Sequence, residues 1–263
     1  MSPSKLILSL LAALTLSTAT AQNPMGGLQI GEGIPPHVES MYRAGLAFLA
    51  STQTRQGNWP DQWGQQPGVV GFAIMAMLAT GEDPNFGPYR TNIRRAAEFL
   101  ITQQDVNTGY IGNSMYNHAF ATLALAELYG HLREPCVGVP LKRAIELILN
   151  SQAQNPRGAW RYQPNAQDAD TTVSGGQIVS LFAAKNAGLE IPVSAIDRAL
   201  DYMRSNMAGD GGIGYTSPSG GNTTRSAIAS LNLSLNNDLT SEEARKIFAY
   251  IRNNIDQGTN YLY

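Results

Sequence analysis

Charged side chains are scarce in this chain of 263 residues. Asp, Glu, Lys and Arg make up 14% of it, whereas average soluble domains contain roughly 25%. The formal net charge is −2 at pH 7. The sequence has no basic stripe and no interleaving of aromatic with basic residues, so we expect no nucleic-acid partner.

Cysteine is almost absent, because Cys136 is the only one. No disulfide can form within the chain, and we expect Cys136 to be a small buried apolar residue. The three histidines, His37, His118 and His131, offer neither a C-x-x-C nor an H-x-x-x-H spacing. Those spacings are typical of zinc sites, so we predict no metal and no cofactor.

Long apolar runs are missing after the first 21 residues. The opening has a short basic start, the apolar run "LILSLLAALTL" and small residues in "ATA" at 19–21. This pattern predicts a secretory signal peptide over residues 1–21, followed by an N-terminal tether over residues 22–36. We therefore expect an exported protein, periplasmic or secreted, with no integral membrane segment once the signal is removed.

A short signature recurs along the rest of the chain. Each copy starts at a helix end and runs into glycine followed by an aromatic or apolar residue. The spacing of about 50 residues indicates stacked supersecondary units. The four copies are "FLASTQTRQGNW" (48–59), "FLITQQDVNTGYI" (99–111), "LILNSQAQNPRGAW" (147–160) and "YMRSNMAGDGGIGY" (202–215), with glycines at 57, 109, 158 and 212.

Each unit contains two kinds of helix. The segment before a signature is amphipathic, as in "YRTNIRRAAEFLITQQ", and the segment after it is apolar nearly all round, as in "AFATLALAEL". Helices of the second kind are expected to be buried on every side. We predict an all-α fold with an outer amphipathic and an inner apolar layer, built from hairpins over 37–81, 89–130, 139–188 and 193–236, and a fifth outer helix over 241–255.

Two motifs carry a resemblance to a known family. Gln53, Gly57 and Trp59, and again Gln154, Gly158 and Trp160, show the spacing Q-x-x-x-G-x-W. This spacing resembles the repeat of squalene-hopene and oxidosqualene cyclases. The segment "MYNHAFATLALAELYG" (115–130) is similar to inner helices of terpenoid cyclases and protein prenyltransferase β subunits. The resemblance implies that residues 37–263 form an α/α toroid around an apolar cavity, with both tryptophans packing outer on inner helices.

The family's toroid closes with about six hairpins, whereas this sequence supplies about four and a half. Relative to the family it is truncated at the C-terminus, and we expect an incomplete ring. The partner of the fifth outer helix is missing, so an apolar wall is expected between that helix and the first hairpin. Such a surface favours self-association.

The stretch "DADTT" (168–172) resembles the D-x-D-D-T motif of class II terpenoid cyclases. The resemblance implies that Asp170 is the general acid that protonates an alkene and that Asp168 supports it. Thr171 stands where the family has a third aspartate. The same residues precede an apolar helix, where Asp, Ser and Thr are common N-caps, and Ser174 with Gln177 fits a capping box. Both interpretations stay open.

The resemblance also implies a ligand cavity near the inner helices. The candidate lining residues are Phe72, Tyr116, His118, Phe120 and Phe182. We expect a binding or scaffold module for an apolar, isoprenoid-like molecule or for a protein partner. A class II cyclase, which is an isomerase, with Asp170 as acid is the alternative. A carbohydrate-active enzyme on an α/α barrel is the third hypothesis, and it would need two carboxylates across a cleft.

Overall fold

The computed structural model describes residues 34–60, 62, 64, 66–81, 83–132 and 136–255. In these ranges it contains nine α-helices and, apart from isolated bridges, no β-structure. The predicted all-α fold is confirmed for this part of the chain, whereas the ring arrangement stays a prediction. The predicted signal peptide over 1–21 and nearly all of the tether over 22–36 lie outside the described residues.

The chain divides into two compact units, Met1–Tyr42 and Arg43–Tyr263. Helix α1 (Pro36–Thr52) begins in the first unit and continues into the second. All the elements considered below belong to the second unit. Among the described residues, no helix has both the length and the apolar character needed to cross a membrane.

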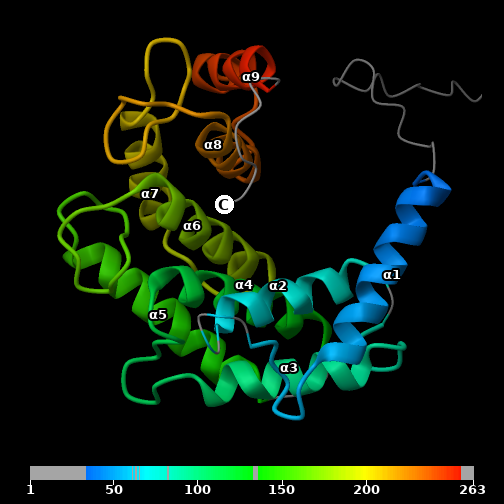
Figure 1. Cartoon of the computed structure of the whole chain (residues 1–263). Coiled ribbons are helices and arrows are strands. Elements are labelled where there is room, and N and C mark those ends of the chain that lie inside the picture. Colours follow the sequence, from blue (N-terminus) through cyan, green and yellow to red (C-terminus); the bar gives the residue numbers. More distant parts are fainter. Residues whose placement is uncertain are drawn as a thin grey trace, which may run out of the picture. The chain divides into compact units, whose positions relative to one another are not determined.

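Four helices of the second unit form its inner layer. Each of them contacts the next along the chain, so the series is continuous (Figure 1). Their positions agree with the apolar segments predicted after each signature. They are α2 (Pro67–Leu78), α4 (Met115–His131), α6 (Thr171–Asn186) and α8 (Thr223–Leu235).

Four further helices of the second unit form the outer layer. Each of them packs against the inner helix that precedes it in the chain. They are amphipathic, as predicted: in the first of them Ile93, Ala96 and Leu100 are buried. Burial of this apolar stripe, rather than intrinsic propensity, provides most of the stability of such short helices. The outer helices are α3 (Arg90–Thr102), α5 (Gly138–Gln154), α7 (Val193–Ser205) and α9 (Glu242–Asn254).

Polar caps mark the start of three of the four inner helices, whereas the N-cap residue of α2, Gln66, makes no side-chain capping bond. Ser114, Asp170 and Asn222 are the N-caps of α4, α6 and α8, and each side chain accepts backbone N–H bonds from the first turn. The cap of α6 is thus Asp170, and the predicted capping box at Ser174 and Gln177 is wrong. The helix starts four residues earlier than that box requires.

A glutamine links each of the first three units to the next. The Nε2 of Gln53 donates to the carbonyl of Gly57 in its own turn, at 3.0 Å, and to the carbonyl of Asn92 in α3, at 2.9 Å. Gln104 bonds Gly109 and Pro140 in the same way, and Gln152 bonds Gly158 and Ala195. The third glutamine is therefore Gln152 and not Gln154, because α5 continues to Gln154, which is exposed.

The turn glycines allow the backbones of successive units to touch. Gly109 has φ +78°, and a Cβ placed there would overlap the carbonyl oxygen of Arg143 in α5. Gly57 meets Arg95 in α3 in the same way, and Gly211 meets Lys246 in α9. The fourth glycine of the series is thus Gly211, which has φ +92°, rather than the predicted Gly212.

The tryptophans pack within their own unit. The indole Nε1 of Trp59 donates to the carbonyl of Leu49, and that of Trp160 donates to the carbonyl of Ile148, both at 2.9 Å. These bonds join the signature loop to the outer helix before it. Cys136 is exposed. The prediction that it is buried is wrong, because it lies in the turn before α5 rather than inside a helix.

Apolar side chains are exposed at both ends of the helix series. Val69 and Phe72 on α2 are 37% and 51% exposed, although this helix was predicted to be buried all round. Leu231 on α8 and Phe248 on α9 are 50% and 47% exposed. Both inner helices lack a neighbouring inner helix on one side among the described residues, which explains the exposure. Self-association stays a prediction.

The glycine contact gives a testable prediction. Gly109→Ala puts a methyl group into the backbone of α5, and Gly188→Ala is the matched control, since Gly188 also has a positive φ but no atom within 4 Å of its Cβ position. The left-handed backbone costs alanine about 1–2 kcal/mol at both sites. We expect Gly109→Ala to lose about 2 kcal/mol more, through overpacking. If urea unfolding shows the same loss of unfolding free energy for both variants, the close contact between Gly109 and the backbone of Arg143 is contradicted.

Candidate functional site

A hollow of about 460 Å³ lies at the N-terminal ends of α2 and α4. Its size falls in the range of small-molecule sites. One side is apolar, with Val69, Phe72 and Phe120, and the opposite side carries amide and hydroxyl groups. The complete lining is Gln66, Gly68, Val69, Phe72, Ser114, Tyr116, Asn117 and Phe120.

Two aromatic rings form the apolar wall of this hollow. The ring centroids of Phe72 and Phe120 are 4.3 Å apart, with the planes tilted by 37°. Glycines on both neighbouring helices lie close to Phe120. A Cβ on Gly71 of α2 would overlap its carbonyl oxygen, and a Cβ on Gly176 of α6 would lie 3.8 Å from its Cζ. Gly71 thus lets the backbones of α2 and α4 approach closely at Phe120, whereas the ring tip of Phe120 is in ordinary contact distance of α6.

The polar rim is held in place by Asn117. Its Oδ1 accepts the backbone N–H of Gly68 at 2.9 Å, and its Nδ2 donates to Gln66 at 2.6 Å and to Asn113 at 2.9 Å. These bonds tie the first turn of α2 to the first turn of α4. The rim is therefore pre-formed rather than assembled by a ligand.

Tyr116 connects the hollow to a second group of side chains. Its hydroxyl donates to the Oγ1 of Thr172, which in turn donates to the Oδ1 of Asp170 at 2.6 Å. Burial is the main cause that raises the pKa of the Tyr116 phenol. The hydroxyl is therefore protonated at neutral pH, its hydrogen is donated to Thr172, and its oxygen can still accept a hydrogen bond.

Asp170 is completely buried at the start of α6. Its Oδ1 accepts three hydrogen bonds, from the Thr172 hydroxyl and from the backbone N–H groups of Thr172 and Val173. Its Oδ2 accepts none among the described residues and lies 3.8 Å from the Nε of Arg161. Asp170 does not line the hollow. A general acid must reach its substrate, so this arrangement favours the capping interpretation.

Asp168 has a different environment. Its side chain is 69% exposed, and its Oδ2 lies 3.5 Å from the Nε of Arg161. The two aspartates therefore share one guanidinium. That guanidinium also lies over the rings of Tyr162 and Tyr215, at 4.9 and 5.1 Å from their centroids, distances at which a cation is attracted by the ring face.

Two of the predicted cavity residues lie elsewhere. Phe182 is 6% exposed and belongs to the apolar core. His118 is fully buried: its Nδ1 accepts the backbone N–H of Ile111 at 3.1 Å, and its Nε2 lies 3.0 Å from the carbonyl of Ala144. His118 thus joins α4 to the signature loop and to α5. The structure brings Phe72, Tyr116 and Phe120 together in one hollow, and it leaves His118 and Phe182 outside the lining.

Arg161, Tyr162 and Tyr215 were missed by the sequence analysis. A signal was present, since "WRY" (160–162) and "GY" (214–215) come within a few residues after the glycines of the third and fourth signatures. Nothing in the sequence indicates that these loops meet. No group of three or more His, Cys, Asp or Glu residues is placed to hold a metal ion in the described part of the chain.

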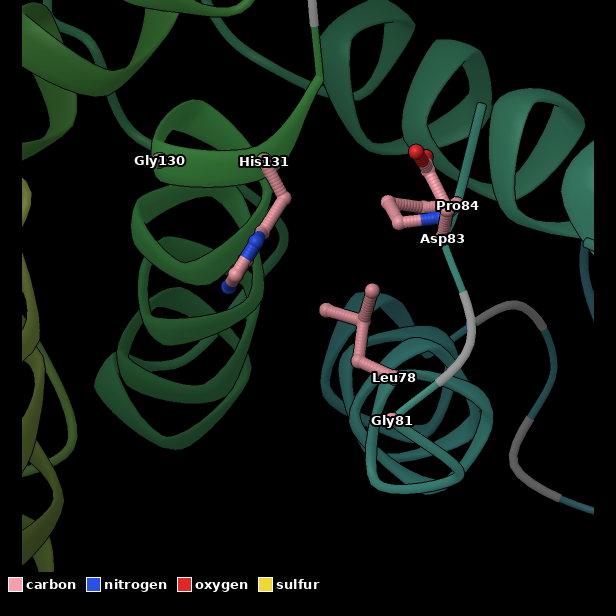
Figure 2. Close-up of a pocket in the computed structure, with 6 residues that line it drawn as sticks. All are labelled: Leu78, Gly81, Asp83, Pro84, Gly130 and His131. Atoms are coloured by element: carbon pink, nitrogen blue, oxygen red, sulfur yellow. The ribbon is translucent and has the colours of Figure 1, made fainter. Parts of the chain in front are cut away.

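A second hollow, of about 330 Å³, lies at the opposite ends of the same two helices (Figure 2). Leu78, Asp83, Pro84 and His131 line it, together with Gly81 and Gly130. Asn85 donates to the carbonyl of His131 at 3.0 Å and to the Oδ1 of Asp83 at 2.8 Å. Its walls lack the contacting aromatic rings of the first hollow, which stays the stronger candidate. No family model matches the chain.

The capping contacts of Asp170 give a testable prediction. Asp170→Asn keeps an Oδ1 acceptor for the first turn of α6, so it should cost about 1 kcal/mol or less, and Asp170→Ala, which removes the acceptor, about 2 kcal/mol. Urea unfolding of both variants measures the difference. If Asp170→Asn lowers the unfolding free energy as much as Asp170→Ala does, the negative charge of Asp170 stabilises the fold rather than its capping hydrogen bonds.

His118 gives a prediction about pH. Burial lowers its pKa from 6.5 to about 4, because the protonated ring would set an N–H against the N–H of Ile111. The unfolded chain then takes up the proton first, so stability is full above pH 6.5 and falls as the pH drops toward 4. The loss amounts to about 3 kcal/mol.

The variant His118→Gln separates this contribution from that of the acidic residues. Glutamine offers one acceptor and one donor but does not titrate. We expect the unfolding free energy of the variant to fall between pH 7 and pH 4 by about 3 kcal/mol less than that of the wild type. The same pH dependence in both proteins would contradict the role of His118.

Proposed function

We propose that this protein is a binding module for an apolar small molecule, taken up in the hollow formed by Phe72, Phe120 and Tyr116. One observation carries the proposal: a pre-formed hollow of about 460 Å³ with a wall of two contacting aromatic rings, in which Phe72 is 51% exposed. Rigid apolar hollows with a few fixed polar groups are typical of ligand sites. An isoprenoid-like molecule is one candidate occupant.

Binding is supported over catalysis by the placement of the carboxylates. Asp170 is buried and uses Oδ1 as a helix cap, and Asp168 is exposed beside Arg161. Neither residue lines the hollow. The cyclase and carbohydrate-active hypotheses therefore have no carboxylate at the hollow itself. We further propose that the protein acts after export, on the basis of the apolar segment within residues 1–21.

A neutral fluorescent probe, N-phenyl-1-naphthylamine, tests the proposal. The wild-type protein should bind it with a rise in fluorescence that saturates. Phe72→Ala should weaken binding about tenfold, because it removes one of the two contacting rings and the apolar area that they bury against the probe.

Phe248→Ala is the matched control. Phe248 on α9 is 47% exposed, close to the 51% of Phe72, but it does not line the hollow. This variant should bind the probe as the wild type does. The proposal fails if the wild type binds no probe, or if both substitutions have the same effect.

A further inference from the structure

A cluster of hydroxyl groups lies beside Tyr116, a residue of the apolar hollow. Tyr116 lines the hollow, and its ring centroid lies 6.1 Å from that of Tyr162. The hydroxyls of Tyr162 and Tyr215 are hydrogen-bonded to each other. Three phenols from α4 and from two separate loops thus form a series that begins at the apolar wall. One end of a ligand that fills the hollow therefore lies beside this group of phenols.

The charges near these phenols cancel. Arg161 faces two carboxylates, with its Nε at 3.5 Å from Asp168 and at 3.8 Å from Asp170. The other cation at Tyr215 is Arg225, whose Nε donates to the carbonyl of Ile213 and whose Nη2 donates to the carbonyl of Gly220. The two cations and two carboxylates sum to zero. The Nη1 of Arg161 is buried and has no hydrogen-bond partner among the described residues, but an anionic group placed here also meets the carboxylate of Asp168, so the net charge that it encounters is zero.

We propose that the hollow takes a neutral single-chain amphiphile with a hydroxyl head group. Its apolar chain packs on Phe72 and Phe120. Its hydroxyl donates to the oxygen of Tyr116 and accepts from the one phenol of the Tyr162–Tyr215 pair whose hydrogen is not used within the pair. This inference rests on the proposed function and names the class of ligand.

A hydroxyl matches the hydrogen-bonding capacity of these phenols. Burial is also the main cause that raises the pKa of Tyr215. A phenol hydroxyl has one hydrogen to donate and an oxygen that accepts, and because the hydrogen of Tyr116 goes to Thr172, Tyr116 offers a ligand its oxygen. A hydroxyl head group can donate to this oxygen and can itself accept a hydrogen bond. A phosphate head group brings at least one negative charge, and it loses hydration that the balanced charges around Arg161 do not replace.

Two probes with the same chain test the head group. Dodecan-1-ol and dodecyl phosphate are compared, below their aggregation concentrations, as competitors of N-phenyl-1-naphthylamine on the wild-type protein. We expect dodecan-1-ol to displace the probe at a concentration at least tenfold lower. If dodecyl phosphate competes equally well or better, the head-group inference is overturned while the proposed function stands. If the protein binds neither the probe nor the alcohol, both fail.

A charge variant gives a second readout. Asp168→Asn removes a carboxylate that is 69% exposed and accepts no bond from a helix end, so the fold should persist. It should improve competition by dodecyl phosphate about two- to threefold, the Coulomb effect of one screened charge at short range in water. Competition by dodecan-1-ol should not change.

Asp201→Asn is the control for this variant, because its side chain is 73% exposed and lies on the outer helix α7. It should alter competition by neither probe. An Asp168→Asn protein that shows the wild-type preference between the two head groups would overturn the electrostatic basis of the inference.

Discussion

Each of the first three units of this fold is joined to the next by one glutamine side-chain amide that donates two hydrogen bonds. Gln53, Gln104 and Gln152 each bond the carbonyl of a turn glycine and the carbonyl of the third residue in the next outer helix. Because a buried carbonyl without a partner is costly, this bond determines the distance between units. At Gly57 and Gly109 the turn then lies against the backbone of the next outer helix, a contact that only glycine allows because it has no side chain.

The candidate site depends on that repeated spacing. Equal spacing places the N-termini of α4, α6 and α8 in comparable positions, each with a polar cap. The loops that precede these caps carry Tyr162 and Tyr215, and the first turn of α4 carries Tyr116. Side chains that are about 50 residues apart in sequence meet for this reason. The close packing of α2 on α4 beside the apolar wall has a separate origin, in Gly71, where a Cβ would overlap the backbone carbonyl oxygen of Phe120.

Much of the fold could be predicted from the sequence, because helical periodicity and cap residues are local signals. The nine helices lie within a few residues of the expected segments. The errors concern contacts between elements. Whether His118 faces a hollow or the carbonyl of Ala144, and whether Arg161 meets Tyr215, depends on how loops from different units pack. Gln154 was preferred to Gln152 because the spacing matched, although only the end of α5 could decide between them.

The fourth unit lacks the bridging amide. Asn206 stands near that position, but its shorter side chain donates to the carbonyl of Tyr202 within α7. The last helix, α9, is instead held by the Gly211 contact and by the bond from Tyr250 to Gly221. Local opening should therefore begin at α9, whose amides should exchange with solvent hydrogen before those of α4 and α6. The hollow lies between α2 and α4, two inner helices away from α8, so fraying at the end of the series leaves its walls intact.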